Sequence, residues 1–312
     1  MRFAFVMDTL DRVSPDKDTT YGFIEAAQAR GHQSYHCQPH EVGHAEGRVR
    51  AVVRPIRERP GALELTGDYE RLWLDEVDAV FVRKDPPFDQ AYFYLTLVLE
   101  RLRGKTLVVN DPRGLRDANE KLYALEFPEL VPRTLVSSDR LALLDFVAAV
   151  GGHAVIKPLD GAGGWGVLSL RSDDRNARAI VDLHTLEGKK LALVQEYLPA
   201  VAEGDKRVLL LDGELLGAIV RVPMQGELRA NIHVGGSVAP TELTARELEL
   251  VAAMGPRLRR DGLVFVGLDL IGERLTEVNV TSPTGIRELS RFTGERVSDR
   301  VIEWVERHAL PR

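Results

Sequence analysis

The sequence predicts an α/β N-terminal domain with a parallel sheet, followed by an α+β region of two lobes with antiparallel sheets. Short apolar runs at residues 3–7, 79–83 and 106–109 alternate with amphipathic stretches in the first third of the chain. This alternation is typical of a parallel sheet covered by helices. After about residue 120 the apolar runs come in pairs, and Asp212-Gly213 marks a hairpin turn between two of them. Paired strands of this kind indicate antiparallel sheets.

The helices of the first part follow from caps and stop signals. Thr19 and Thr20 can cap a helix that runs through residues 23–28, and Gly31 would end it. A second helix is expected at residues 90–103, between two of the apolar strands. The polar, arginine-rich stretch before residue 79 has no assigned element.

The second part begins with a helix at residues 138–150. Thr244 and Glu247 form a capping box for a later helix that reaches about residue 260. The expected strands cover residues 153–156, 167–170, 191–197, 208–211, 215–222, 263–272 and 275–280. We therefore predict boundaries near residues 120 and 200, which divide the chain into segments 1–120, 121–200 and 201–312.

Composition and charge limit the classes of partner. The chain has 312 residues, of which 44% are hydrophobic and 28% charged, as in ordinary globular proteins. Its net charge of -6 argues against nucleic acid as the main partner, because phosphate binding needs a basic surface. The lone Cys37 excludes a disulfide framework within the chain, and no apolar run approaches the length that spans a bilayer. We expect a cytoplasmic protein with neither nucleic acid nor membrane as a partner.

Residues 40–44 match the H-E-x-x-H pattern of zinc peptidases. That chemistry needs both histidines on one face of a helix. Pro39 precedes the motif and Gly43 lies inside it, which is poor helical context. We predict a polar surface segment here and no zinc site.

Residues 161–166 formally satisfy the dinucleotide pattern G-x-G-x-x-G. A dinucleotide fold needs a helix directly after these glycines, whereas residues 167–170 predict a strand. A glycine loop between two strands resembles a flap over phosphates, although the kinase motifs H-R-D and D-F-G are absent from the sequence. Lys157, which ends the preceding strand, can reach such phosphates. Taken alone, the loop could equally be a structural turn.

Three oxygen-bearing side chains are expected to converge on the last hairpin. Glu277 and Asn279 are two residues apart on a strand, so they share one face. If residues 272–274 form a three-residue loop, Asp269 lies directly opposite Glu277. Two carboxylates and an amide suit Mg²⁺ held between the protein and phosphates. The alternative, a solvated polar face, is disfavoured because the apolar neighbours look buried and unpaired carboxylates there would be costly.

Arginines before and within a glycine-containing segment suggest a substrate site under a lid. Arg221 precedes residues 223–236, and Arg229 and Asn231 lie within that segment, while Arg207 is on an earlier strand. Guanidinium groups bind carboxylates through two parallel hydrogen bonds, and such a segment can close as a lid. Isolated arginines are usually only solvated, so this interpretation requires the lid and the metal site to share a domain.

Several stretches together resemble the bacterial glutathione synthetases, which are carboxylate–amine ligases of the ATP-grasp family. The matching stretches are Val82-Arg83-Lys84-Asp85-Pro86-Pro87-Phe88-Asp89, Asn119-Glu120-Lys121, Lys157-Pro158-Leu159-Asp160-Gly161, Gly204-Asp205-Lys206-Arg207-Val208, Gly267-Leu268-Asp269 and Asn279-Val280-Thr281-Ser282-Pro283-Thr284. They occur in order over nearly the whole chain. The resemblance implies an ATP-grasp domain with a central lobe at 121–200, which carries the glycine loop, and a C-terminal lobe at 201–312, which carries the metal site and the lid.

The resemblance also implies a role for each site residue. Those expected to bind ATP are Lys121, Lys157, Gly161, Gly163, Gly164, Gln195, Glu196, Tyr197, Leu198 and, at the ribose, Asp205. Those expected to bind Mg²⁺, with Mn²⁺ as an alternative ion, are Asp269, Glu277 and Asn279. The expected catalytic residues are Arg207, Arg221 and Arg229. Those three would also bind substrate, together with Arg83, Asp85, Asn231 and Ser282.

The resemblance implies an ATP-dependent ligase that forms glutathione from γ-L-glutamyl-L-cysteine and glycine. The reaction would pass through an acyl phosphate and release ADP and phosphate. A homo-oligomer is expected on the same ground. Two rival hypotheses remain: an ATP-grasp ligase that joins D-alanine or glutamate to another acceptor, and a nucleotide-binding regulatory module without turnover.

Overall fold

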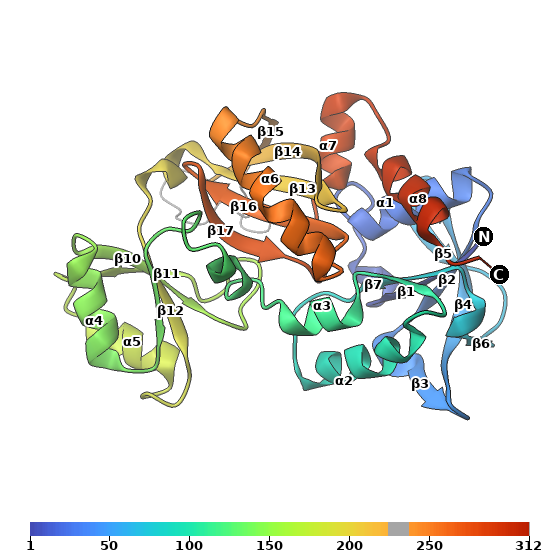
Figure 1. The fold of residues 1–312 in the computed structure, drawn as a ribbon, viewed down its shortest axis with the longest axis horizontal. Helices are drawn as coiled ribbons and strands as arrows, with labels where there is room; N and C mark the ends of the chain where they lie inside the picture. Colours follow the sequence, from blue (N-terminus) through green and yellow to red (C-terminus); the bar gives the residue numbers. More distant parts are fainter. Residues whose placement is uncertain (224–236, 312) are drawn as a thin grey trace.

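The computed structural model describes residues 1–223 and 237–311, which form three sheets and the helices around them (Figure 1). In the N-terminal sheet, the strand order is β3-β4-β2-β1-β7-β8, with β5 and β6 paired to β4. The parallel strands are β1 (Arg2–Met7), β2 (Gln33–Cys37), β7 (Ala79–Arg83) and β8 (Leu107–Val109). The prediction of a parallel sheet is confirmed for these four strands.

The arginine-rich stretch adds antiparallel strands to that sheet. These strands are β3 (Val42–Ala45), β4 (Arg48–Arg59), β5 (Ala62–Leu65) and β6 (Glu70–Trp73). The H-E-x-x-H residues are therefore split between a 3₁₀ turn, Pro39–Glu41, and strand β3. Within the described residues no group of three His, Cys, Asp or Glu side chains could hold a metal ion. His40 and His44 are both exposed, so the motif lies at the surface.

Three helices accompany the N-terminal sheet: α1 (Thr19–Ala29), α2 (Gln90–Leu99) and α3 (Pro112–Asp117). Helix α1 begins where expected, but Asp18 caps it by accepting hydrogen bonds from the Thr20 and Tyr21 amides. The two threonines lie inside the first turn and are buried. The predicted helix at 90–103 is divided into α2 and a 3₁₀ turn. Across the described residues the 3₁₀ turns are Leu10–Arg12, Pro39–Glu41, Leu74–Glu76, Glu100–Leu102, Tyr123–Glu126 and Pro199–Glu203.

The central lobe is a four-stranded antiparallel sheet with two helices against one face (Figure 1). Its strand order is β11-β10-β12-β9, formed by β9 (Thr134–Ser137), β10 (His153–Pro158), β11 (Leu168–Arg171) and β12 (Ala192–Glu196). Its helices are α4 (Arg140–Ala149) and α5 (Ala177–Thr185). A separate apolar core joins these elements through buried residues such as Leu143, Val181 and Val194. The predicted arrangement of strand, glycine loop and strand is confirmed.

The C-terminal lobe is a five-stranded antiparallel sheet of order β15-β14-β13-β16-β17. Its strands are β13 (Asp205–Leu211), β14 (Glu214–Val222), β15 (Ser237–Pro240), β16 (Phe265–Ile271) and β17 (Arg274–Asn279). Helix α6 (Ala245–Arg260) packs against this sheet and begins at the predicted Thr244–Glu247 capping box. The fold class predicted for this part of the chain is therefore confirmed.

The last two helices, α7 (Ile286–Thr293) and α8 (Val297–His308), return the chain to the N-terminal domain. Helix α8 packs along α1, as Figure 1 shows beside the chain termini. One apolar core contains Phe23 of α1, Phe81 of β7, Phe265 of β16 and Val301 of α8. The N-terminal domain and the C-terminal lobe are thus packed around shared apolar cores. No helix of the described chain is long and apolar enough to cross a membrane.

The register of the last hairpin decides where the predicted metal ligands lie. Asp269 pairs directly with Glu277, as predicted. The connecting loop has two residues, Gly272 and Glu273, both with positive φ, and the expectation of three was wrong. A β-bulge after Asp269 adds one residue to β17, and this restores the predicted pairing.

Candidate active site

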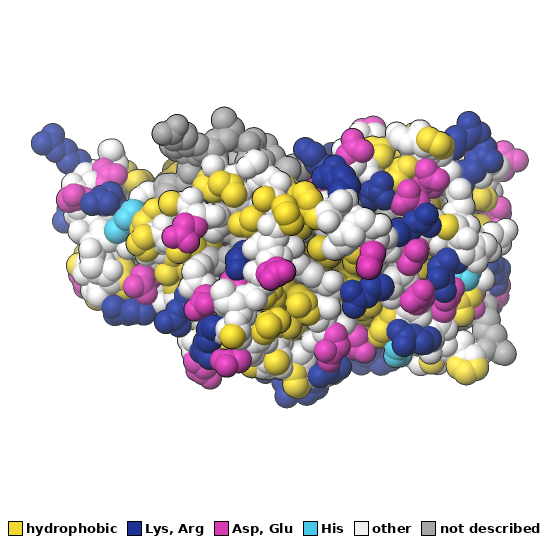
Figure 2. Space-filling model, turned by 90° about the horizontal axis from the view of Figure 1, so that it is seen from above, with side chains coloured by type: hydrophobic (Ala, Val, Ile, Leu, Met, Phe, Trp, Pro, Cys, Tyr) yellow, Lys and Arg dark blue, Asp and Glu magenta, His cyan; other side chains and the backbone are white. Residues whose placement is uncertain are grey.

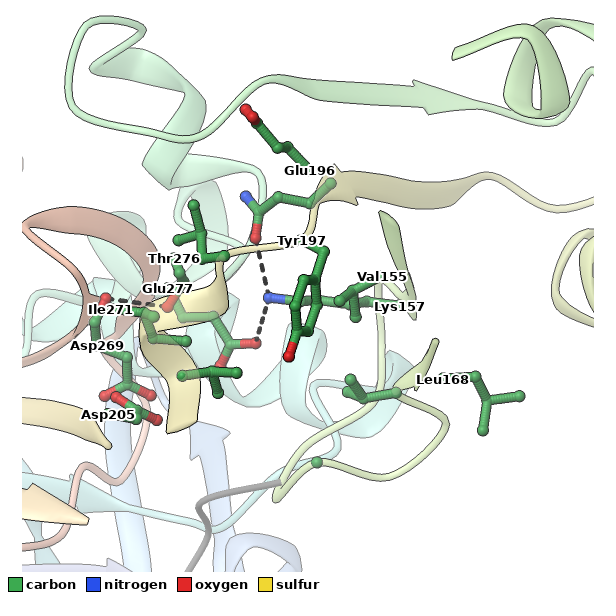
Figure 3. A pocket seen from close by; sticks show the side chains of 15 residues that line it. Val155, Lys157, Leu168, Glu196, Tyr197, Asp205, Asp269, Ile271, Thr276 and Glu277 are labelled. Atoms are coloured by element: carbon green, nitrogen blue, oxygen red, sulfur yellow. Dashed lines mark hydrogen bonds and ion pairs between the residues drawn. The ribbon is translucent and has the colours of Figure 1, made fainter. Parts of the chain in front are cut away.

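A cleft with about 830 Å³ of empty space lies between the central and C-terminal lobes. The central lobe contributes residues from β10, β12 and the end of the glycine loop, including Lys157, Gly164 and Tyr197. The C-terminal lobe contributes Asp205, Asp269, Ile271 and Glu277, among others. Figure 3 shows Asp205, Asp269 and Glu277 on one side and Val155, Leu168 and Tyr197 on the other. An apolar pocket with a few charged groups at one end suits a nucleotide, and we name it the nucleotide cleft.

The glycine loop, residues 161–166, connects β10 to β11 beside this cleft. Its start requires glycine, because a Cβ on Gly161 would lie 2.7 Å from Pro158 Cγ and 2.8 Å from the Trp165 carbonyl oxygen. Gly163 and Gly164 have φ angles of 63° and 78°, in the left-handed region that favours glycine. A glycine-rich turn leaves its amides exposed to a ligand, so the local sequence fits a loop that covers phosphates.

Two buried lysines lie beside this loop. Lys121 Nζ donates to the Gly161 carbonyl oxygen at 2.6 Å, and Lys157 Nζ lies 3.2 Å from Gln195 Oε1. Both ammonium groups face Glu277, whose Oε1 is 3.9 Å from Lys121 and 3.7 Å from Lys157. Figure 3 shows Lys157 pointing at Glu277 across the cleft. The two ammonium groups therefore lie at the end of the cleft where phosphates would bind.

The segment from Gln195 to Leu198 lines the wall of the cleft. The side chain of Gln195 is held between Lys157 and Thr134, whose hydroxyl accepts from the Gln195 amide at 3.0 Å. Tyr197 stacks on His153 with ring centroids 3.9 Å apart. Glu196 points away from Lys157 in Figure 3 and accepts a long hydrogen bond from the Arg133 amide. A base bound here would meet the backbone of this segment and the aliphatic side chains around it.

Charged side chains form a row across the C-terminal sheet. Strand pairing places Asp205 opposite Arg221, Arg207 opposite Asp269, and Asp269 opposite Glu277. Arg207 binds both oxygens of Asp269, at 2.6 and 3.2 Å. Arg221 forms an ion pair with Asp269 at 3.0 Å and also bonds Asp205. Because residues two apart on a strand share a face, the sheet itself positions this row.

Burial and charge act in opposite directions on the two aspartates. Burial disfavours the charge of Asp269, but Arg207 and Arg221 outweigh it and hold the pKa of this carboxyl well below its usual range. Burial raises the pKa of Asp205 to about 6, against the attraction of Arg221. Asp269 is therefore a fixed negative charge at neutral pH.

Asp269, Glu277 and Asn279 fit a divalent cation. All three line one polar cleft, and their donor atoms are oxygens, which Mg²⁺ prefers. The buried atom of Asn279 that has no hydrogen-bond partner among the described residues is its amide nitrogen, Nδ2. Nδ2 is a donor, so an acceptor such as a phosphate oxygen would satisfy it, while the amide oxygen is the atom that could bind the cation.

That polar cleft lies next to the nucleotide cleft and shares Asp269 and Glu277 with it. Every predicted substrate residue that the structure describes lines it: Arg83, Asp85, Arg207, Arg221 and Ser282. The remaining two, Arg229 and Asn231, lie outside the described residues. The predicted ATP residues and the predicted substrate residues thus meet at the proposed metal ligands.

Arg83 joins the N-terminal domain to this cleft from a buried position. Its Nε donates to Thr20 Oγ1 at 3.1 Å and its Nη2 donates to the Pro283 carbonyl oxygen at 3.0 Å. Asp85, by contrast, is exposed at the mouth of the cleft. Arg83 therefore fixes α1 and the loop after β17, whereas Asp85 remains open to a ligand.

One acidic residue near the site had been assigned no role. Glu120 accepts a hydrogen bond from Thr281 at 3.1 Å, and its backbone carbonyl oxygen accepts from the Val278 amide. Burial, together with the charge of Glu277, raises the pKa of Glu120 to about 7. The position of Glu120 directly before Lys121 is the sequence signal that could have placed it near the site.

The family model described as prokaryotic glutathione synthetase, N-terminal domain, matches residues 1–116, and the model for the ATP-grasp domain of the same family matches residues 120–294. Glutathione synthetase of Synechocystis sp. is 44% identical, with 98% of this chain and 99% of the relative covered. Glutathione synthetase of Agrobacterium fabrum is 41% identical, with 97% and 96% covered.

Solved structures of similar fold are more distant in sequence. D-cycloserine synthetase DcsG has a TM-score of 0.67 at 19% identity, with 98% of this chain and 100% of that chain covered. An ATP-grasp protein with a RimK domain from Sphaerobacter thermophilus has a TM-score of 0.63 at 21% identity, with 97% and 99% covered. At this identity the likeness establishes the ATP-grasp fold alone. The family models and the full-length relatives described above show that the chain belongs to the prokaryotic glutathione synthetase family of ATP-dependent ligases.

Proposed function

We propose that this chain joins the cysteinyl carboxyl group of γ-L-glutamyl-L-cysteine to the amino group of glycine, using ATP. The observation that carries the proposal is the meeting of two clefts at Asp269 and Glu277. A phosphoryl group that moves from nucleotide to carboxylate must cross such a junction. The family relatives named glutathione synthetase supply the identity of the two substrates.

In this proposal ATP lies in the nucleotide cleft with its base against residues 195–198 and its ribose near Asp205. Lys121, Lys157 and the amides of Gly161, Gly163 and Gly164 meet the phosphates. Phosphoryl transfer depends mainly on positioning and on neutralising charge, and two lysines with a glycine loop supply both. The lysines reach over Glu277 in the present structure, so they already point where phosphates would bind.

Asp269, Glu277 and Asn279 would hold Mg²⁺, which would neutralise charge on the transferring phosphoryl group. Arg207 and Arg221 form ion pairs with Asp269, and these contacts orient its carboxylate. Mn²⁺ offers similar oxygen chemistry and is the second ion to test. Removal of divalent ions with a chelator is expected to abolish ADP release, and addition of Mg²⁺ to restore it.

A free carboxylate resists attack by an amine because its charge is delocalised and its leaving group is poor. Phosphorylation gives an acyl phosphate, which the glycine amine attacks, and phosphate then leaves. Arg207 and Arg221 line the polar cleft and would stabilise negative charge on the tetrahedral carbon's oxygen. Arg229 and Asn231 are proposed to assist from the adjoining segment, and Arg83, Asp85 and Ser282 to bind the peptide.

An assay of ADP release in the presence of Mg²⁺ tests the proposal. Release that requires both γ-glutamylcysteine and glycine, with glutathione as product, is the expected result. Release with D-alanine in place of both substrates would instead support the rival ligase. If no ADP is released with any of these substrates, the result would support the rival hypothesis of a regulatory module that binds nucleotide without turnover.

We also propose that the enzyme acts in the cytoplasm as a homo-oligomer, with the three segments 1–120, 121–200 and 201–312 as its domains. The single described cysteine, Cys37, is free and buried, which suits a reducing compartment. The face in Figure 2 shows acidic and basic side chains interspersed, without a continuous basic surface over its described part. Light scattering of the purified protein would test the oligomer, and a monomer mass would contradict it.

A further inference from the structure

The glycine loop is held at both ends by side chains from other elements. At its start, Lys121 donates to the Gly161 carbonyl oxygen, and Lys190 pairs with Asp160 at 2.8 Å. At its end, Nε2 of His184 lies 2.7 Å from the Gly166 carbonyl oxygen. The function described above leaves His184 without a role.

His184 lies in the last turn of α5, and its ring connects that helix to the loop. Its Nδ1 is 2.9 Å from the carbonyl oxygen of Ile180, one turn earlier. Both ring nitrogens thus face carbonyl oxygens, which only accept hydrogen bonds. The imidazolium form donates to both oxygens at once, whereas the neutral ring donates to one. A ring that donates through Nε2 ties α5 to the last residue of the loop.

The backbone at Gly166, the end of the loop, is closely packed, whereas the side chain of Trp165 is exposed to solvent. A Cβ on Gly166 would lie 2.9 Å from Pro158 Cγ, so the backbone passes closely over this proline. Trp165, the preceding residue, is 71% exposed. The loop therefore has two fixed ends and a tip that projects outward, which is the arrangement expected of a flap that bends between its anchors.

We propose that His184 is a positioning residue for ATP, because it fixes the end of the glycine loop through the Gly166 carbonyl group. This inference rests on the proposed function, in which the loop's amides meet the phosphates. Ordering a free loop on binding costs conformational entropy, and an anchored loop pays less of that cost. His184 is not among the residues that line the nucleotide cleft or the polar cleft, so we assign its effect to the position of the loop.

Two substitutions separate this contact from the packing of α5. A glutamine side chain reaches as far as Nε2, so His184→Gln keeps a donor for Gly166. An asparagine side chain reaches only as far as Nδ1, so His184→Asn keeps the donor for Ile180 and loses the loop contact. Loss of one hydrogen bond predicts a rise of about three- to tenfold in the KM for ATP of His184→Asn. We expect the KM for γ-glutamylcysteine to stay unchanged, and His184→Gln to resemble the parent protein.

Loop position is also measurable without any turnover. In the nucleotide-free protein, hydrogen exchange of the amides at residues 161–167 is expected to quicken in His184→Asn and to stay unchanged in His184→Gln. The nucleotide-induced change in Trp165 fluorescence, isolated by subtracting the signal of Trp165→Phe, reports the binding of ADP with Mg²⁺. Half-saturation of that change is expected at about three- to tenfold higher ADP in His184→Asn.

Equal loop exchange and equal ADP binding in the parent protein and both variants would overturn the proposal. Equal impairment of both variants would overturn it as well, since that result would assign the effect to α5 and not to the loop. If the parent protein failed to bind ADP, the proposed function would be contradicted, and the exchange comparison would still decide the anchoring role of His184.

Discussion

Residue by residue, the charged row on the C-terminal sheet is positioned by strand register and secured by its own ion pairs. Arg207 and Asp269 are buried, with side chains 8% and 7% exposed. Arg207 also donates to the Thr284 carbonyl oxygen at 3.0 Å, which connects the row to the loop after β17. A buried pair contributes little beyond its desolvation cost, but a buried charge without its partner is strongly destabilising. The stability of this row therefore depends on the presence of every charged residue in it.

Replacement of Arg207 by methionine tests this dependence. The substitution leaves Asp269 buried with less positive charge around it, so we expect the free energy of unfolding to fall by about 3–5 kcal/mol. Urea unfolding followed by circular dichroism gives the value. Arg140→Met removes an exposed pair with Asp182 and is the matched control, with an expected loss of at most about 1 kcal/mol. Similar losses in both variants would contradict the buried role of Arg207.

Glu277→Gln separates catalysis from stability at the same site. Its side chain is 22% exposed and lies near both lysines, so the fold is expected to tolerate a neutral amide. Loss of a carboxylate that would hold the cation acting on the transferring phosphoryl group is expected to lower kcat by about 10²–10³-fold. Steady-state ADP release measures kcat, and thermal melting checks that the variant is folded. Full activity would remove Glu277 from the proposed metal site.

At the scale of elements, the sequence predicted most of what builds the site and missed what depends on distant packing. The Thr244–Glu247 box, the hairpin at Asp212-Gly213 and the pairing of Asp269 with Glu277 are local patterns, and all three are confirmed. Strands β3 to β6 were missed because their outward arginines hide the alternation, as the burial pattern of β4 shows. Strands β3 and β5 pair with β4 across two-residue turns, whereas the pairing of β4 with β2 and β6 spans longer connections.

The return of α8 to α1 could not be predicted from local pattern either, since it joins the two ends of the chain. Arg30 binds Glu303 and Glu306 at 3.1 and 2.7 Å, and His32 lies 2.6 Å from Glu306. Apolar residues of α1 and α8 share one buried core beneath these pairs. No element was predicted over residues 297–308, so neither α8 nor its partner followed from the local pattern.

These contacts give α8 a pH dependence that Glu306→Gln removes. The Arg30 hydrogen bond, with help from His32, lowers the pKa of Glu306 from 4.5 to about 2. A lowered carboxyl pKa contributes stability that is fully present above pH 4.5 and is lost as pH falls toward 2. We expect the parent protein to be more stable than Glu306→Gln at pH 7, by at most about 1 kcal/mol because the pair is partly exposed. The difference should shrink when urea unfolding is repeated at pH 3.5, and a constant difference would contradict the assignment.

At the scale of the whole molecule, the distribution of apolar cores defines what can move. Two cores each join residues of the N-terminal domain with residues of the C-terminal lobe. The central lobe has a core of its own, built around Leu143, Ile156 and Val194. The nucleotide cleft lies between this lobe and the C-terminal lobe. The architecture therefore favours motion of the central lobe against a larger body made of both ends of the chain.

This division predicts how protection from hydrogen exchange responds to nucleotide. ADP with Mg²⁺ contacts Lys157 on the central lobe and Asp269 on the larger body in our proposal, so binding should slow exchange across residues 134–196 more than across β1 or β7. Leu143→Ala opens a cavity in the separate core and is expected to destabilise the central lobe by about 2–5 kcal/mol. Exchange should then quicken in β10 and β12 while β1 and β7 keep their protection. Val301→Ala, in the core that joins α8 to α1, is the matched substitution and should quicken exchange in α1 instead. Equal effects of the two variants on all elements would mean that the chain unfolds as one unit, and the central lobe would then have no independent motion with which to close on ATP.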